Sequence, residues 1–239
     1  MGLRGIGWVL VAGLVLATGC GGGGGGGSLP NPTVGFFNAS PDSPNVDFLV
    51  DDGDFGANNP FLSGTAFKSS DPDGRDLRAL ESGTTNEIDV VFSILNKDKH
   101  YLVALLGLVN FGSENLKRSR LTAIQVNRDA PIGNKARLYI FHGYNREAGF
   151  DTPNIDFKNP GDNPQFKAAD IPPGQAQSIL VDSGNVDYEV RRSGTDQVLI
   201  PAATLALGAG KIYGVYVVGV ENGTGSLTPQ IVAVEIPPE

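Results

Sequence analysis

Pro44-Asn45-Val46-Asp47-Phe48 occurs a second time in this chain as Pro153-Asn154-Ile155-Asp156-Phe157, and all five positions keep their character. Other segments repeat in the same order on either side. The further pairs are Phe36-Phe37-Asn38 with Ile140-Phe141-His142, Asn59-Pro60 with Asn163-Pro164, Ser82-Gly83 with Ser183-Gly184, and Tyr101-Leu102-Val103 with Tyr213-Gly214-Val215. A repeat this long that occurs only twice indicates tandem globular domains rather than a solenoid.

The repeat divides the chain into a first domain at residues 33–130 and a second at residues 135–239. The hinge between them is expected at Asn127 to Lys135, which lacks an apolar pattern. Short apolar segments bounded by Gly, Pro, Asn and Asp predict strands at Val34–Asn38, Val46–Val50, Tyr101–Asn110, Leu121–Val126, Arg137–His142, Asp187–Arg192, Ile212–Val220 and Ile231–Ile236. Helices are expected to be scarce. This pattern favours an all-β fold of two tandem immunoglobulin-like antiparallel β-sandwich domains.

Two of the expected strands are apolar on both faces. Leu102 to Val109 and Ile212 to Val220 lack the alternation of a half-exposed strand, so we expect central strands that are covered on each side. The chain has one cysteine and one tryptophan, Trp8, which lies in the leader. The tryptophan and disulfide core of antibody domains is therefore absent.

The opening of the first domain resembles a known family. Phe36 to Asp51, with the turn Ala39-Ser40-Pro41-Asp42, is similar to the opening of the domain of unknown function family 4397, found in bacterial surface proteins and lipoproteins. The family motif has His where this chain has Asn38, whereas the second copy keeps His142. Gly208-Ala209-Gly210-Lys211-Ile212-Tyr213 resembles the family's turn into its long apolar strand. The resemblance implies a β-sandwich with no known enzymatic activity.

The N-terminus resembles a bacterial lipoprotein signal. Arg4 precedes an apolar run from Ile6 to Leu16, and Leu16-Ala17-Thr18-Gly19-Cys20 resembles the lipobox. Residues 1–19 are interpreted as a signal peptide, and residues 20–32 as a lipidated Cys20 followed by a glycine-rich tether with a reach of about 20 Å. An ordinary signal peptide followed by a free cysteine is the alternative. Gly21 favours an outer-membrane lipoprotein that faces the periplasm or the cell surface.

Charge argues against nucleic acid as a partner. Removing residues 1–19 takes away one basic side chain and no acid, so 17 basic side chains face 26 acidic ones. Binding to phosphates needs clustered Lys and Arg. The one local cluster, Lys117, Arg118 and Arg120, is read as a solvated turn.

No motif for catalysis or for a cofactor is present. The two histidines, His100 and His142, lie in different copies at the ends of expected strands, whereas a histidine metal site usually needs several ligands on one frame. The sequence has no Gly-x-Ser-x-Gly elbow, zinc-binding helix or phosphate loop. We therefore predict no catalytic residue, no metal and no cofactor.

Acidic stretches and aromatic side chains are the remaining candidates. Asp51-Asp52-Gly53-Asp54 and Asp71-Pro72-Asp73-Gly74-Arg75-Asp76 are expected in turns, with calcium as a minor alternative because the EF-hand positions are not met. Asp47 and Asp156 repeat, and we expect a structural role above a ligand contact. Phe67, placed at the position of Ile171, and Phe61, near Phe166, are expected in the core. Phe55 is then the exposed aromatic. Phe55, Asp47, Asp156 and His142 are the candidate ligand contacts.

Two functional hypotheses follow. The first is a non-catalytic lipoprotein of the cell envelope, anchored in the membrane by lipid, whose two modules have a binding or structural role with an envelope protein or a glycan as partner. The second is an envelope hydrolase or carbohydrate-active enzyme that pairs Asp51 with Asp54 or Asp73 with Asp76. The first is preferred because these carboxylates have no visible partner that would orient a base.

Overall fold

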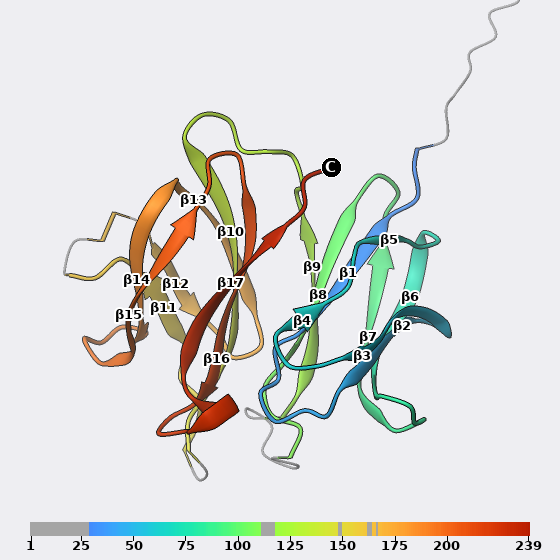
Figure 1. Cartoon of the computed structure of the whole chain (residues 1–239), viewed down its shortest axis with the longest axis horizontal. Coiled ribbons are helices and arrows are strands. Elements are labelled where there is room, and N and C mark those ends of the chain that lie inside the picture. Colours follow the sequence, from blue (N-terminus) through green and yellow to red (C-terminus); the bar gives the residue numbers. More distant parts are fainter. Residues whose placement is uncertain (1–28, 111–117, 148–149, 162–163, 166) are drawn as a thin grey trace, which may run out of the picture.

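Four β-sheets form successive layers in the computed structural model, two from each half of the chain, and they follow one another from left to right in Figure 1. The structure describes residues 29–110, 118–147, 150–161, 164–165 and 167–239. The predicted signal peptide, Cys20 and most of the predicted tether therefore lie outside the described residues, as do Lys117, Asn163 and Phe166.

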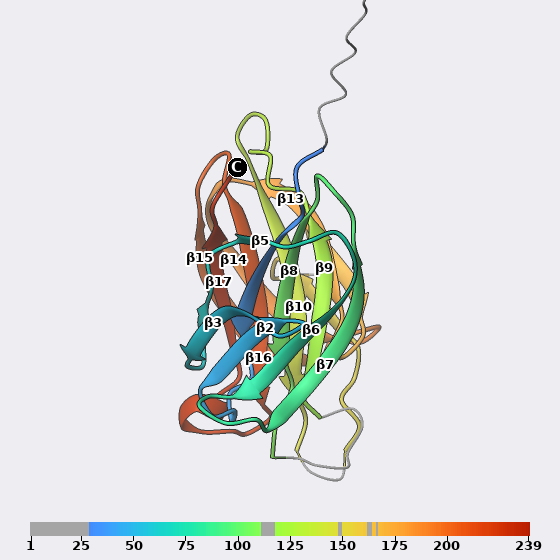
Figure 2. The ribbon, with the colours of Figure 1, turned by 90° about the vertical axis from the view of Figure 1, so that its right-hand side faces the viewer.

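The first domain pairs an outer sheet with an inner one (Figure 2). The outer sheet has the order β3-β2-β6-β7, made of β3 (Gly53–Asn59), β2 (Val46–Val50), β6 (Asp73–Glu81) and β7 (Glu87–Leu95). The inner sheet has the order β4-β1-β8-β9, made of β4 (Ser63–Gly64), β1 (Thr33–Asn38), β8 (His100–Leu106) and β9 (Arg120–Val126), and β5 (Lys68–Ser69) also pairs with β1.

The second domain repeats this arrangement. Its outer sheet is β12 (Lys167–Ile171), β11 (Ile155–Lys158), β14 (Gly184–Arg192) and β15 (Val198–Leu207). Its inner sheet is β13 (Ala176–Asp182), β10 (Lys135–Asn145), β16 (Ile212–Val220) and β17 (Gln230–Ile236). In the described part of the chain, the only helical element is the 3-10 turn Gly225–Leu227. The all-β fold with two tandem immunoglobulin-like sandwiches is therefore confirmed.

One strand pair in each domain differs from the expected antiparallel arrangement. β1 runs parallel to β8, and β10 runs parallel to β16. Parallel neighbours need a long crossover. Here the chain enters the outer sheet twice between the two parallel strands, and β4 and β5, or β13, lie in the inner sheet between these visits. The inner sheets are consequently mixed, whereas every pair of the outer sheets is antiparallel.

Strand register supports most of the repeat and corrects part of it. Val46 lies opposite Glu81, and Ile155 lies opposite Arg192, so the turn after Glu81 corresponds to the turn after Arg192. The partner of Ser82-Gly83 is therefore Ser193-Gly194, and the expected match with Ser183-Gly184 is wrong. Ser82 N and Ser193 N both donate to the backbone of the repeated motif, at 2.8 and 2.9 Å.

Three apolar clusters fill the spaces between the four sheets. One cluster lies inside each sandwich, and the third lies between the two inner sheets. In β8, Tyr101, Val103 and Leu105 face the first domain's own core, whereas Leu102, Ala104 and Leu106 face the second domain. β16 alternates in the same way. The prediction that both strands are covered on each side is confirmed, and the second cover is the other domain.

Several segments expected in turns or loops form strands. β3 begins at Gly53 and β6 at Asp73, so both acidic stretches run into the outer sheet of the first domain. The expected strand Tyr101–Asn110 ends earlier, at Leu106, because Gly107 has φ 82°, a conformation that breaks the strand. No helix of the described residues is long and apolar enough to cross a membrane.

Candidate functional site

A polar cavity of about 260 Å³ opens at the end of the first domain where the described chain begins. It is lined by residues from the start of the described chain, the end of β2, the β2–β3 turn, β3, β5, the segment between β5 and β6, and β6. Those that matter for its chemistry are Asn31, Asp51, Phe55, Ser70, Asp71 and Arg75. The cavity brings together Phe55 with members of both acidic stretches, which the sequence alone gave no reason to combine.

Arg75 is the centre of the cavity's charge. Its Nη1 lies 3.0 Å from Asp51 Oδ2, and its Nη2 lies 4.0 Å from Asp71 Oδ2 and donates to Pro72 O at 3.0 Å. Asp51 Oδ1 also accepts the backbone N–H of Asp76 at 3.0 Å. This backbone hydrogen bond, together with Arg75, holds the pKa of Asp51 below its ordinary value. The cavity therefore presents one guanidinium between two carboxylates, the nearer of which is ion-paired with it, rather than an isolated acid.

Phe55 forms the apolar floor of the cavity, and the prediction that it is exposed is wrong. The side chain is 8% exposed because β3 starts two residues earlier and turns position 55 inward. Its ring meets Phe36 edge to face at 6.0 Å, and Phe36 stacks on Phe48 at 4.9 Å. Lys68 Nζ lies 6.0 Å from the ring centre on its other side.

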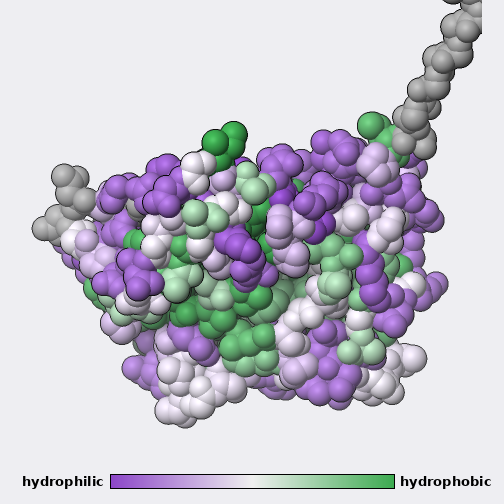
Figure 3. Space-filling model, turned by 45° about the horizontal axis from the view of Figure 1, so that its top comes forward, coloured by the Kyte–Doolittle hydropathy of each residue, from purple (hydrophilic) through white to green (hydrophobic). Residues whose placement is uncertain are grey.

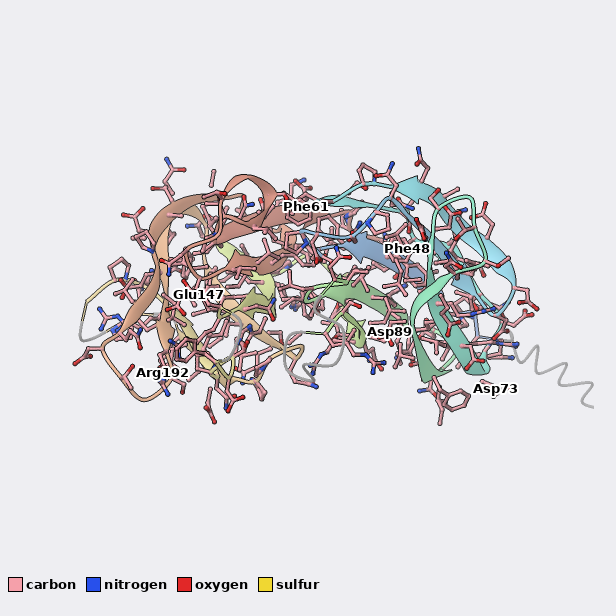
Figure 4. The ribbon with its side chains drawn as sticks, turned by 90° about the horizontal axis from the view of Figure 1, so that it is seen from below. Phe48, Phe61, Asp73, Asp89, Glu147 and Arg192 are labelled. Carbon is pink, nitrogen blue, oxygen red and sulfur yellow. The ribbon has the colours of Figure 1, made fainter. Side chains whose placement is uncertain are left out.

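The other aromatic side chains of this region take part in the core between the domains. Phe61 and Phe67 are partly buried against that core, and Figure 4 places Phe61 where the two domains meet. The guanidinium of Arg128 lies 4.5 Å from the centre of the Phe67 ring. Ile171 lies opposite Ile155 just as Asn59 lies opposite Val46, so Ile171 corresponds to Asn59 and not to Phe67.

Asp47 and Asp156 accept backbone hydrogen bonds in their own domains. Asp47 takes the N–H of Asn58 at 2.7 Å and that of Gly83 at 3.0 Å. Asp156 takes the N–H of Asp170 at 2.9 Å and pairs with Lys167 at 2.8 Å. Burial alone would raise the pKa of both carboxyls, but these hydrogen bonds lower it overall. The hydrogen bonds to neighbouring loops that we expected are thus present in both domains, and neither aspartate lines this cavity.

His142 is enclosed within the second domain. Its side chain is 1% exposed, Nε2 lies 2.9 Å from the carbonyl of Pro153, and Nδ1 has no hydrogen-bond partner among the residues that the structure describes. Desolvation lowers its pKa to about 4, so the ring is neutral at pH 7. The domains do pack face to face, yet His100 contacts Thr33 and Glu239 instead. The two histidines do not share a site.

The carboxylate pairs considered for catalysis do not form a cleft. Asp54, Asp73 and Asp76 are exposed, and Figure 4 places Asp73 at the outer end of the first domain. Of the four aspartates in the two pairs, Asp51 lines the cavity, and its carboxylate is ion-paired with Arg75. No group of three or more His, Cys, Asp or Glu side chains among the described residues is arranged to hold a metal ion.

Two lining residues were missed in the sequence. Asn31 falls in the segment interpreted as tether, and nothing in that segment distinguishes it. Arg75 could have been recognised from the sequence, because it is the single cation inside the second acidic stretch. A lone cation among closely spaced carboxylates predicts an ion-pair centre, and this centre is what the structure shows.

One face of the molecule shows how polar and apolar residues are distributed beside the domain junction (Figure 3). In the view of Figure 3, the margins are hydrophilic and hydrophobic residues gather left of the centre, over the second domain and next to the line where the domains meet. The cavity itself has more polar than apolar lining, so its chemistry is that of hydrogen bonds over one buried ring.

Comparisons with known proteins include distant likenesses to solved structures, two of which follow. Neither a protein-family model nor a curated protein matches the chain. It is similar to a crystal structure of CBMbc (family CBM26) from Eubacterium rectale Amy13K in complex with maltoheptaose, with a TM-score of 0.25 and 10% identity over 87% of this chain and 98% of that chain. It is also similar to a Bacteroides ovatus ATCC 8483 protein proposed to act in cell adhesion, with a TM-score of 0.27 and 9% identity over 88% and 98%. At TM-scores this low, no residue of this chain is matched to a residue of either structure.

Proposed function

We propose that this chain is a non-catalytic envelope lipoprotein whose first domain binds a glycan in the cavity around Arg75. The observation that carries the proposal is the lining: a guanidinium hydrogen-bonded to one carboxylate and 4.0 Å from a second, with an amide and hydroxyls beside them, and the single ring of Phe55. Such alternating donors and acceptors suit the hydroxyl groups of a sugar.

Binding is favoured over hydrolysis because of the state of the carboxylates. A glycosidase needs one carboxyl with a raised pKa as its acid and a second carboxylate across the scissile bond. The pKa of Asp51 is lowered, and Arg75 lies between Asp51 and Asp71. The cluster thus supports recognition of a ligand without proton transfer.

Anchoring by lipid is the second part of the proposal. It is supported by the lipobox-like sequence before Cys20 and by the short glycine-rich tether. The cavity opens beside Asn31, at the end of the molecule from which the tether leaves. A glycan bound there would lie near the membrane, in the outer-membrane setting that Gly21 indicates. Membership of the domain of unknown function family 4397 is part of the same proposal.

A glycan array with the purified chain tests the ligand. We expect the Kd for the glycan to rise about tenfold in Asn31→Ala and in Asp71→Asn. Each variant loses a group that would hydrogen-bond to the sugar, and the loss of about 1.4 kcal/mol of binding free energy corresponds to a factor of ten. The Asp71 side chain is 77% exposed, so its loss should leave the fold intact. Asp52→Asn is the matched control, since Asp52 is 99% exposed and does not line the cavity. Equal weakening in all three variants, or no glycan bound by the wild type, would contradict the proposal.

Cell fractionation tests the anchor. The wild type should sediment with membranes, whereas Cys20→Ser should lose most of that association. Retention of the variant in the membrane fraction after a salt wash would argue for another means of attachment. The glycan experiment does not depend on this result, because the cavity lies wholly among described residues.

A further inference from the structure

Strand β7 has an unusual combination of features for an edge strand. It is the last strand of the outer sheet of the first domain, and among the described strands it pairs with β6 alone (Figure 2). Its outward side chains are Val90, Phe92 and Ile94, which are 41%, 66% and 62% exposed. A long edge strand with apolar side chains is a ready template for another strand, and most proteins guard such edges.

The same residues have free backbone groups. Asp76, opposite Phe92, exchanges backbone hydrogen bonds with Asp51 on the β2 side of β6: Asp51 N donates to Asp76 O at 2.7 Å, and Asp76 N donates to Asp51 Oδ1. Asp76 and Phe92 are therefore a non-hydrogen-bonded pair of the ladder, and the N–H and C=O of Phe92 point away from β6. The regular register from Asp73 to Ala79 extends this direction to Val90 and Ile94.

The equivalent strand of the second domain is guarded. Asp187 corresponds to Asp76, so Thr204 of β15 stands where Phe92 stands in β7, and Ala206 stands in place of Ile94. β15 also contains Pro201, and its pairing with β14 shifts register twice. Proline, small side chains and bulges are devices that prevent strand addition. β7 has no proline, and its one register shift with β6 lies at its start, opposite Ala79 and Leu80, so the stretch from Val90 to Ile94 has neither device.

We propose that two copies of this chain pair through β7, antiparallel and centred on Phe92. This register places Phe92 opposite its own copy, and Val90 opposite Ile94 of the other chain. All three positions become hydrogen-bonded pairs, because their free N–H and C=O groups face the partner strand. The contact is isologous, as a two-fold dimer requires, and it joins the two outer sheets into one continuous sheet.

Charge complementarity favours a second copy as the occupant. The antiparallel register brings Glu87, at the start of β7, next to Lys97 of the other chain, just beyond the end of its β7, and the same contact forms again across the two-fold axis. Both side chains belong to exposed residues. Glu87 Oε2 also accepts from Arg78 Nε of its own chain at 2.8 Å, so Lys97 would be its second cationic partner. Stable complexes typically bury roughly 1,200–2,000 Å². A single strand pair is a small contact by that measure, so we expect a weak dimer whose population rises with protein concentration.

Cysteine cross-linking of the full chain in membranes tests the register. Residues opposite each other in a hydrogen-bonded pair have Cα atoms about 5.5 Å apart, within the range of a disulfide. Phe92→Cys should therefore give a disulfide-linked dimer on mild oxidation. Thr204→Cys, the equivalent position of the second domain, is the matched control. The wild type, whose only cysteine is Cys20, is the second control: any disulfide-linked dimer that it forms does not depend on position 92.

A mixed pair of variants makes the test specific. Val90→Cys and Ile94→Cys should cross-link when the two chains are expressed together and should not cross-link alone, because two copies of either position lie about 13 Å apart along the strands. Equal dimer from Phe92→Cys, Thr204→Cys and the wild type would overturn the proposal. A β7 cross-link to a different protein would overturn it as well.

Sedimentation or size-exclusion measurements over a range of protein concentrations test the dimer independently of cross-linking. The wild type should pass from monomer to dimer as its concentration rises, whereas Phe92→Lys should remain monomeric with an unchanged unfolding midpoint, because position 92 is exposed in the monomer. Thr204→Lys should dimerise like the wild type. A monomeric wild type at all concentrations would overturn the proposal. Failure of this test would not affect the glycan proposal, because Phe92 does not line the cavity.

Discussion

The repeated Pro-Asn-hydrophobic-Asp-Phe motif acts at the level of single residues. In each domain its Asn and Asp hold one residue of the following strand in the left-handed region: Asn58 with φ 58° and Asp170 with φ 56°. The Asn amide donates to that residue's side chain at 2.8 and 2.9 Å, and the Asp carboxylate accepts its backbone N–H. Left-handed backbone costs energy in residues other than Gly, so the motif stabilises a bend that both domains need.

Removing the carboxylate should therefore cost stability. Asp47→Ala is expected to lower the free energy of unfolding by about 1–2 kcal/mol, because two backbone donors lose their acceptor. Asp47→Asn should lose less, since its amide oxygen still accepts one bond. Urea unfolding measures the difference, with Asp54→Ala as the exposed control. A loss in Asp54→Ala equal to that in Asp47→Ala would contradict this role.

His142 should make the stability of the chain depend on pH. Its pKa is about 4 in the folded state and about 6.5 when unfolded. Between these values the unfolded chain binds one more proton than the folded chain, so the stabilising contribution is fully present above pH 6.5 and is lost as pH falls toward 4. The slope is about 1.4 kcal/mol per pH unit for one proton. Desolvation of the buried ring is the main cause, and the positive charge of Arg120 adds to it.

The first domain supplies the matched control for His142. Asn38 occupies the corresponding position, is equally buried and does not titrate. We therefore expect that His142→Asn unfolds with a much flatter dependence on pH from 6.5 to 4.5, a range above the lowered pKa values of Asp47, Asp51 and Asp156. Urea unfolding at several pH values measures this. An unchanged slope in the variant would assign the effect to other groups.

At the level of elements, the sequence predicts the strands whose character comes from their own residues. β2 and β16 have the expected bounds, because each is apolar and β-branched and ends at turn residues. β6 and β7 were not expected. β6 begins in an acidic stretch, and β7 exposes its apolar face to solvent, so neither shows the usual pattern of a half-buried strand.

The candidate cavity was predictable only in part. Phe55 and Asp51 were named from the sequence, but the role of Phe55 was wrong because the inward alternation of β3 could not be read from a Gly- and Asn-rich segment. The joining of Asp51, Asp71 and Arg75 depends on the β2–β6 pairing, a contact between distant segments. Periodicity within one segment does not specify such a pairing.

The loop between β12 and β13 fastens the second domain to the first. Thr122 Oγ1 donates to Gly174 O at 2.6 Å, and Arg120 Nη1 donates to Pro173 O at 3.2 Å. Gly174 has φ 71°, and a Cβ atom there would lie 2.1 Å from Arg120 Cδ. The position therefore requires glycine both for its backbone and for the passage of the arginine side chain.

Substitution of this glycine should weaken the junction. Gly174→Ala is expected to lower the free energy of unfolding by about 2 kcal/mol or more, because the cost of the left-handed backbone is added to the displacement of Arg120. Gly194→Ala is the control, since Gly194 has the same φ of 71° but nothing within 4 Å of a Cβ atom. Chemical denaturation compares the two. An equal loss in both variants would show that space at the junction does not matter.

At the level of the whole molecule, the two sandwiches share one core. Tyr216 of the second domain is stacked between Phe37 of the first domain, at 4.0 Å, and Phe141 of its own, at 5.1 Å. The linker after β9 is also held in place, because Arg128 donates to Pro237 O and Pro238 O near the C-terminus. Apolar burial between domains couples their unfolding, since neither can open without exposing the other's inner sheet.

Calorimetry should detect this coupling. The wild type is expected to unfold in one transition, and Tyr216→Ala should lose about 3–5 kcal/mol and separate the transition into two, because the ring fills the space between the domains. Tyr188→Ala is the control: this ring is equally buried but stacks on Phe157 inside the second domain. It should lower the midpoint and keep a single transition. If Tyr188→Ala separated the transitions while Tyr216→Ala did not, the domains would be coupled through something other than the shared core.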